Sequence, residues 1–161
     1  MEQNSDDLDK WDRRILAILA EDGRLPVATL ADRIGLSRTP TLARLRRLEA
    51  SGVIRGYRAV IDPARLGRQH VAFAEVKLSD TRAAARAEFN AAVRKVPGIE
   101  ECHMIAGGFD YLLKVRTEDI AAYRRLLGDA LSTLPHVAQT STYVAMETVK
   151  DLGDAPAPRR G

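Results

Sequence analysis

The sequence lacks several features on which common protein chemistries depend. It contains one cysteine, Cys102, and three histidines, at positions 70, 103 and 136, and aromatic residues make up only 5% of the chain. A single cysteine excludes an intrachain disulfide and a cysteine-rich metal cluster. The histidines are 33 residues apart and do not have the spacing of metal ligands. We therefore expect neither a disulfide framework nor a metal site.

Long apolar runs and phosphate-binding motifs are also missing. No apolar stretch is long enough to span a membrane, and the acidic first ten residues lack the apolar segment of a secretory signal. Neither G-x-x-x-x-G-K-[ST] nor G-x-G-x-x-G occurs. Cys102 and His103 are neighbours on an expected strand, so their side chains point to opposite faces and cannot form a nucleophile–base pair. We expect a cytoplasmic protein without a membrane partner, without catalytic residues, and not an enzyme.

Positive charge is present but unevenly distributed. The 161 residues carry a net charge of only +3. Residues 1–32 have a net charge of −4, residues 33–66 have eight arginines against two acids, and the remainder has a net charge of +1. Arginine is the side chain that binds phosphates and guanine edges with two parallel hydrogen bonds. The same run would also suit a solvated helix face, so its structural setting has to decide.

The arginine-rich segment coincides with a helix-turn-helix pattern. Apolar spacing predicts helices over residues 8–20, 27–34 and 38–50. Gly35 is expected to end the second helix in a left-handed conformation, and Ser37 to cap the third. The alternation over residues 53–61 predicts a β-hairpin, the wing of such domains. We therefore expect a DNA-binding domain over residues 1–62, with the helix-turn-helix at about 27–50 and a wing or linker at 53–62.

The third helix is the expected DNA-recognition element. An α-helix fits the major groove, where its N-terminal residues reach base edges while arginines contact phosphates. The interpretation of an ordinary helical hairpin with a basic solvent face is less favoured, because hairpin, glycine turn, cap and arginines coincide. An architectural, nucleoid-like protein with little sequence specificity remains an alternative, because base and phosphate contacts both use arginine. The expected DNA contacts on this helix are Arg38, Thr39, Thr41, Arg44 and Arg47, with Thr41 the weakest because it lies nearest the apolar stripe.

The second half of the chain follows another rhythm. Strands are expected at 71–78, 99–106, 111–115 and 137–149, and helices at 83–96 and 119–134. The order βαββαβ is the split βαβ arrangement of ferredoxin-like domains, here over residues 70–150. Residues 151–161 have no apolar pattern and are expected to form a disordered tail. The fold class is thus α+β, a winged helix-turn-helix followed by a ferredoxin-like domain.

The turn Gly107-Gly108-Phe109-Asp110 supports two interpretations. It can be a hairpin turn that the aspartate stabilises. It can also be a site where exposed backbone N–H groups and a carboxylate hold an amino acid, because glycines permit left-handed geometry and close approach. A ferredoxin-like domain that binds a small molecule or acts as an enzyme is a further alternative, which the basic helix-turn-helix disfavours.

Several stretches of the chain resemble one family. LDKWDRRIL, LADRIGLSRTPTLARLRRLEASGVIRGY, EECHMIAGGFDYLLKVR and TYVAMETVK are similar to the Lrp/AsnC, or feast/famine, transcription regulators over about residues 8–150, and above all to the leucine-responsive members. The resemblance implies a sequence-specific transcription regulator whose assembly and binding to double-stranded DNA respond to an amino acid. It also implies a homodimer formed through the C-terminal sheets, assembly to an octamer, and association with the nucleoid. The effector, leucine or another small amino acid, would be the only bound small molecule, with no cofactor.

The resemblance further implies an effector site in the C-terminal domain. Three positions depart from the leucine-responsive pattern: Gly108 replaces an aspartate, Ala145 a valine and Ile120 a methionine. Each change alters the size or polarity of a pocket, so the resemblance leaves the identity of the effector open. The positions that match the effector-responsive residues and the glycine turn are Met104, Gly107, Gly108, Asp110, Ile120, Tyr143, Val144 and Ala145.

Overall fold

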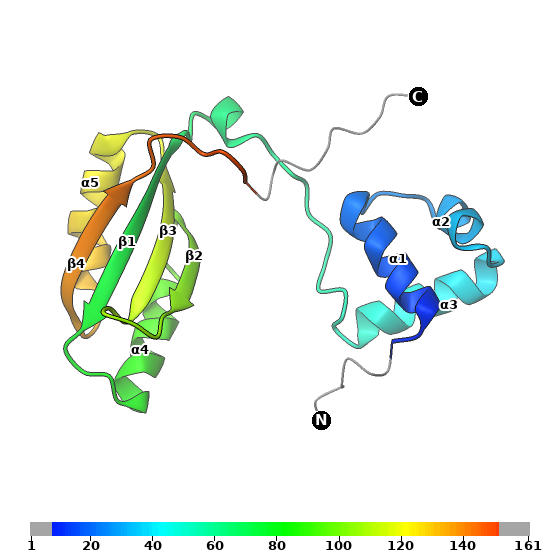
Figure 1. The fold of residues 1–161 in the computed structure, drawn as a ribbon, viewed down its shortest axis with the longest axis horizontal. Coiled ribbons are helices and arrows are strands. Elements are labelled where there is room, and N and C mark those ends of the chain that lie inside the picture. The colour runs from blue at the N-terminus through cyan, green and yellow to red at the C-terminus, as the bar shows by residue number, and fades with distance from the viewer. Residues whose placement is uncertain (1–7, 152–161) are drawn as a thin grey trace. The chain divides into compact units, whose positions relative to one another are not determined.

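The computed structural model describes residues 8–151. The chain divides into two compact units, one ending at Val60 and one beginning at Ile61, each with its own core (Figure 1). The tail that the sequence predicts to be disordered lies, except for residue 151, outside the described residues.

The N-terminal unit consists of three helices, α1 (Lys10–Glu21), α2 (Val27–Ile34) and α3 (Arg38–Ala50). The bounds of α2 and α3 are those predicted from the sequence. Gly35 has a φ of 72° and ends α2 in the left-handed conformation, as predicted. Pro40 falls in the first turn of α3, where its missing N–H removes no helical hydrogen bond. The three helices pack around a small core in which four apolar residues are almost completely buried: Ile15, Leu30, Ile34 and Leu48.

The cap of α3 differs from the expectation. Ser37 occupies the N-cap position, but its side chain makes no capping hydrogen bond. Instead, its carbonyl oxygen accepts hydrogen bonds from both the backbone N–H and the hydroxyl of Thr41, at 3.3 and 2.9 Å. The first turn of α3 is therefore fixed by Thr41 rather than by the serine hydroxyl.

The predicted β-hairpin over residues 53–61 is wrong. The described chain has no strand in this segment, and Val60 and Ile61 are 60% and 59% exposed. Only Ile54 packs against the helical core, while the Tyr57 hydroxyl donates a hydrogen bond to Glu49 on α3 at 3.0 Å. Two short strands that bury no apolar face are marginal in water, so the alternating pattern alone does not produce a wing.

The C-terminal unit has the predicted βαββαβ order. A 3₁₀ turn at Pro63–Leu66 leads into β1 (His70–Leu78), followed by α4 (Ala83–Val93), β2 (Ile99–Met104) and β3 (Tyr111–Thr117). The chain continues through α5 (Ile120–Asp129), a second 3₁₀ turn at Leu131–Thr133 and β4 (Val137–Val144). The antiparallel sheet has the order β2-β3-β1-β4, as in the split βαβ arrangement. The α+β fold class is confirmed.

Both helices of this unit cover the same face of the sheet (Figure 1). Alternate strand residues such as Ala74, Val76 and Leu113 point into this core, where the rings of Phe89 and Tyr111 lie with their centroids 4.5 Å apart. Because side chains alternate along a strand, the intervening residues point to the opposite, open face. The open face is therefore where strand side chains remain available to a ligand or partner.

Some element ends differ from the predictions. Helix α5 ends at Asp129 instead of Leu134, and Asp119 caps its N-terminus by accepting a hydrogen bond from Ala122 N–H at 2.6 Å. Helix α4 stops at Val93 rather than Val96. Strand β4 ends at Val144 rather than Val149; Val144 pairs with Ala72, and its neighbour β1 extends only two residues further, to His70.

Candidate functional site

The N-terminal turn of α3 exposes two of the side chains that the sequence predicts as DNA contacts. Arg38 and Thr39 are exposed there, as predicted. Arg46 is exposed as well, and it lies seven residues, or about two helical turns, after Thr39 on the same face of the helix. The sequence prediction omitted Arg46 from the contact residues, although its position beside the polar face could have included it.

Thr41 is not available to DNA, and its inclusion among the contacts was wrong. The residue is fully buried. Its hydroxyl donates to the carbonyl of Ser37 within its own helix. The helical angle of Thr41 lies near the apolar stripe, and the structure places it on that buried side.

Arg44 and Arg47 are occupied by two carboxylates of the N-terminal end of α1. Arg44 Nη1 lies 2.5 Å from Asp9 Oδ2 and 3.0 Å from Asp12 Oδ1, and Arg47 Nη2 lies 2.5 Å from Asp12 Oδ2. Asp12 is completely buried, while the Arg44 and Arg47 side chains are 27% and 55% exposed. We call these four residues the α1–α3 clamp. Sequence reasoning missed these ion pairs, because 32 and 35 residues separate Asp12 from the two arginines.

The first turn of α1 holds the clamp in place. Asp9 and Asp12 form a reciprocal capping box, in which each side chain accepts a hydrogen bond from the backbone N–H of the other. The hydrogen bond from the Asp12 N–H, together with Arg44, lowers the pKa of Asp9 to about 2. The guanidinium pKa of Arg44 is raised, chiefly by its hydrogen bond to Asp9. Asp9 and Arg44 each favour the charged form of the other, so this pair is an ion pair near neutral pH.

The predicted effector residues lie near two different ends of the sheet. Met104, Gly107, Gly108 and Asp110 surround the β2–β3 turn, which is tied to the end of β1 by a hydrogen bond from Asp110 N–H to the Val76 carbonyl, at 2.9 Å. The second group lies at the other end of the sheet and consists of Ile120 at the start of α5 and Tyr143, Val144 and Ala145 at the end of β4. There the Ala145 N–H donates a hydrogen bond to the carbonyl of Val71. A single chain therefore does not bring the two groups together.

Asp110 has a structural task in the β2–β3 turn. Its Oδ2 accepts a hydrogen bond from Leu78 N–H at 2.7 Å, next to the bulge between Lys77 and Leu78 in the β1–β4 pairing. Neither Gly107 nor Gly108 has a positive φ, so the left-handed geometry that the glycine pair would allow is not used. The contacts support the interpretation of Asp110 as a turn-stabilising residue, and its part in effector binding stays a prediction.

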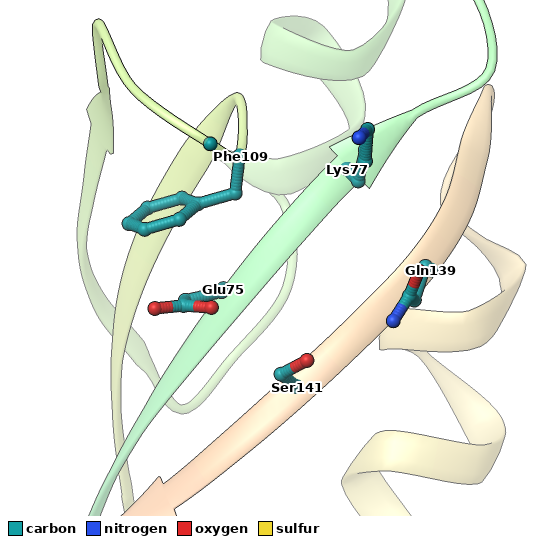
Figure 2. Close-up of a pocket in the computed structure, with 6 residues that line it drawn as sticks. Glu75, Lys77, Phe109, Gln139 and Ser141 are labelled. Atoms are coloured by element: carbon teal, nitrogen blue, oxygen red, sulfur yellow. The ribbon is translucent and has the colours of Figure 1, made fainter.

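A shallow hollow of about 140 Å³ opens on the sheet between β1, β4 and the β2–β3 turn. Figure 2 shows Glu75 and Lys77 on β1 and Gln139 and Ser141 on β4, with the Phe109 ring on the side of Glu75 that faces away from β4. Gly108 completes the lining and is the only predicted effector residue in it. The hydroxyl of Tyr143 donates to Glu75 at 3.3 Å, which extends the polar surface along β4. The hollow thus offers one negative and one positive group side by side.

A second charged cluster lies on the open face of the sheet. Arg116 Nε is 2.7 Å from Glu100 Oε1, Lys114 Nζ is 3.1 Å from Asp151 Oδ1, and Arg116 also pairs with Asp151. Lys114 further lies 3.4 Å from Glu101, so the acidic pair of β2 is partnered rather than simply solvated. We call these five residues the sheet cluster. It connects the segment that follows β4 to β3.

Cys102 is half-buried against the C-terminal core, and burial raises the pKa of its thiol. Between residues 8 and 151, no three His, Cys, Asp or Glu side chains gather in a way that could hold a metal ion. None of the helices in this range has the length and apolar character that crossing a bilayer requires.

Comparison with known proteins links both units to one kind of protein. Residues 8–55 match the winged helix-turn-helix DNA-binding family model, and residues 71–154 match the Lrp/AsnC ligand binding domain. The chain is 60% identical to the proline dehydrogenase transcriptional activator of Rhizobium radiobacter over 149 residues. The alignment covers 92% of this chain and 96% of that protein. It is 49% identical over 144 residues to the leucine-responsive regulatory protein of Escherichia coli K12, covering 89% and 88%. The solved structure of a Neisseria meningitidis transcriptional regulator in complex with L-methionine matches with a TM-score of 0.82 and 34% identity, over 89% of this chain and 93% of that one.

Proposed function

Because the chain belongs to the Lrp/AsnC family of DNA-binding transcription regulators, we propose that it controls a gene of amino-acid catabolism in response to an amino acid. The first candidate target is a proline dehydrogenase gene, because the R. radiobacter relative that activates such a gene is more similar to this chain than the leucine-responsive relative. The observation that carries the proposal is the pairing of an exposed basic recognition helix with the family's ligand-binding domain in one chain.

DNA would be read by α3 in the major groove. Arg38 and Thr39 at its N-terminus would reach base edges, and Arg46 on the same exposed side would contact a phosphate or a guanine. These side chains make no ion pair within the described residues, so their charge and hydrogen-bonding capacity are available. The architectural alternative receives no support from the comparisons, in which the similar proteins are regulators of transcription.

The effector would bind with its charged head group at the hollow on the sheet. A free amino acid carries an ammonium and a carboxylate, and Glu75 and Lys77 present the complementary charges from one strand. Lys77 is exposed and has no ion-pair partner in the part of the chain that the structure describes. The L-methionine bound to the Neisseria relative fits this class of ligand. Leucine, methionine and proline are the effectors to compare first.

A complete effector site would need more than one copy of the chain. The turn group, Met104, Gly107, Gly108 and Asp110, and the second group, Ile120 with Tyr143 to Ala145, lie at different ends of one sheet. Met104, Tyr143 and Val144 are 64%, 55% and 48% exposed, which leaves apolar surface for a second chain to cover. We propose a cytoplasmic, nucleoid-associated homodimer that assembles further to an octamer, with two recognition helices spaced for half-sites one helical turn apart.

The test measures affinity for the promoter of the proline dehydrogenase gene and for unrelated DNA of the same length, with and without each amino acid. We expect tighter binding to the promoter and a shift of about tenfold in affinity with one of the amino acids. Lys77→Ala should lose that shift and keep the affinity measured without effector. Lys95→Ala, which removes an exposed lysine after α4, is the matched control and should keep the shift. Equal affinity for promoter and unrelated DNA would instead favour the architectural alternative.

A further inference from the structure

The α1–α3 clamp gives two arginines of the recognition helix a role other than contacting DNA. We propose that Asp12 is a positioning residue for DNA reading: with Arg44 and Arg47 it fixes α3 against α1 and withholds both arginines from DNA phosphates. The inference rests on the proposal that α3 is the DNA-reading helix. It changes the expectation from the sequence, in which Arg44 and Arg47 are themselves DNA contacts.

The geometry leaves Asp12 no unused oxygen. Oδ1 accepts from Arg44 at 3.0 Å, and Oδ2 accepts from Arg47 at 2.5 Å and from the backbone N–H of Asp9 at 3.1 Å. Arg44 also binds Asp9, so two carboxylates from one helical turn face two guanidinium groups that lie three residues, about one turn, apart on α3. The four charges bridge the two helices at a single point.

The burial of Asp12 makes it costly for Arg44 or Arg47 to leave this carboxylate for a DNA phosphate. Asp12 is completely buried, and a buried carboxylate is stable in its charged form only while it remains paired and hydrogen-bonded. If Arg47 left to contact a phosphate, part of that pairing would be lost inside the protein. Arg38 and Arg46 are exposed and make no ion pair with a carboxylate of the described residues. The positive charge that α3 has available for DNA therefore lies on these two residues rather than on the clamp.

Salt dependence separates a withheld arginine from one that contacts DNA. Each phosphate contact adds about 0.9 to the slope of log affinity against log salt concentration. The measurement uses the full-length protein and a duplex of unrelated sequence, so it does not depend on which gene is the target. Arg46→Gln should reduce the slope by about 0.9 per DNA-binding domain. Arg47→Gln should leave the slope unchanged, although both substitutions remove one arginine of the same helix.

Removing the Asp12 charge should free Arg47 from the clamp. Asp12→Asn should steepen the slope, because Arg47, which is already half-exposed, becomes free to contact a phosphate. The ratio of promoter affinity to unrelated-DNA affinity should fall by about tenfold, since α3 is no longer fixed. In the double variant Asp12→Asn with Arg47→Gln the slope should return to that of the unchanged protein. Glu21→Gln removes the same charge from an exposed position at the end of α1 and should change neither quantity.

Two results would overturn the proposal. One is a slope for Arg47→Gln that falls as far as that of Arg46→Gln, which would make Arg47 a phosphate contact. The other is an Asp12→Asn variant that folds, as judged by its thermal transition, and behaves like Glu21→Gln. A variant that only lost packing would bind DNA less tightly but would not gain salt dependence. If Asp12→Asn does not fold, the comparison of Arg46→Gln with Arg47→Gln still decides.

Discussion

The two units of the chain use buried charge in different ways. The N-terminal unit has a core of four almost fully buried apolar residues, and its clamp joins two helices through a carboxylate with no solvent exposure. The C-terminal unit has twelve buried residues in its core, and the sheet cluster lies on the face away from that core. Ion pairs therefore contribute differently to the two units. In the smaller unit they set the orientation of α3 against α1. In the larger unit the apolar core already fixes the helices on the sheet, and the ion pairs add to that.

The largest expected effect is on the C-terminal core. Phe89→Ala removes a fully buried ring that contacts Tyr111, and should reduce the stability of this unit by about 3–5 kcal/mol. Trp11, the single tryptophan of the chain, lies in α1 and reports on the N-terminal unit alone. We expect the denaturant midpoint followed by far-UV circular dichroism to fall for the C-terminal transition, while the midpoint followed by Trp11 fluorescence stays in place. A joint shift of both signals would contradict the separation of the two cores.

The reciprocal prediction concerns the N-terminal core. Leu48→Ala removes a buried side chain of α3 and should destabilise its unit by about 3 kcal/mol, since leucine truncations in cores cost about 2–5 kcal/mol. Leu48 is one of only four residues in the buried centre of this core, so the Trp11 transition should move to much lower denaturant concentration. The far-UV transition of the sheet unit should remain. Leu66→Ala, which truncates a 60% exposed leucine outside both cores, is the control and should leave both transitions unchanged.

The sequence predicted the elements well where local signals agreed. The bounds of α2 and α3 follow from apolar spacing, from Gly35 in the left-handed conformation and from Pro40 in a first turn. The order of strands and helices in the second unit follows from the change of period along the chain. The predicted hairpin after α3 is wrong. An alternating pattern forms a stable strand only where a sheet or core covers its apolar face, and this segment has none.

The candidate sites were less accessible to sequence reasoning. Arg44 and Arg47 are arginines on a basic helix in the sequence, and only the structure shows that Asp12 neutralises them from another helix. Asp110 was open between two interpretations, and its hydrogen bond to Leu78 depends on a strand 32 residues away. Contacts between distant segments have no local periodicity, so composition and spacing do not reveal them.

The smallest expected effect comes from the sheet cluster and sharpens the contrast with the clamp. Asp151→Asn removes the carboxylate that binds Lys114 and Arg116. Arg116 keeps Glu100 at 2.7 Å and Lys114 keeps Glu101 at 3.4 Å, so neither cation is left without a carboxylate. Arg116 is buried, but because both cations stay paired, the loss in stability of the C-terminal unit should be about 1–2 kcal/mol, below the cost of a broken buried ion pair.

Chemical denaturation followed by far-UV circular dichroism can resolve this difference when Glu147→Gln, an exposed residue of the same segment, serves as the charge-matched control. In the clamp, by contrast, removal of the Asp12 charge takes away the carboxylate that Arg47 contacts and leaves Arg44 with Asp9 alone. A loss above about 3 kcal/mol in Asp151→Asn would place it in the range of a broken buried ion pair. The sheet cluster would then be as structural as the clamp, and the size of the apolar core would no longer explain why one unit depends on its charges more than the other.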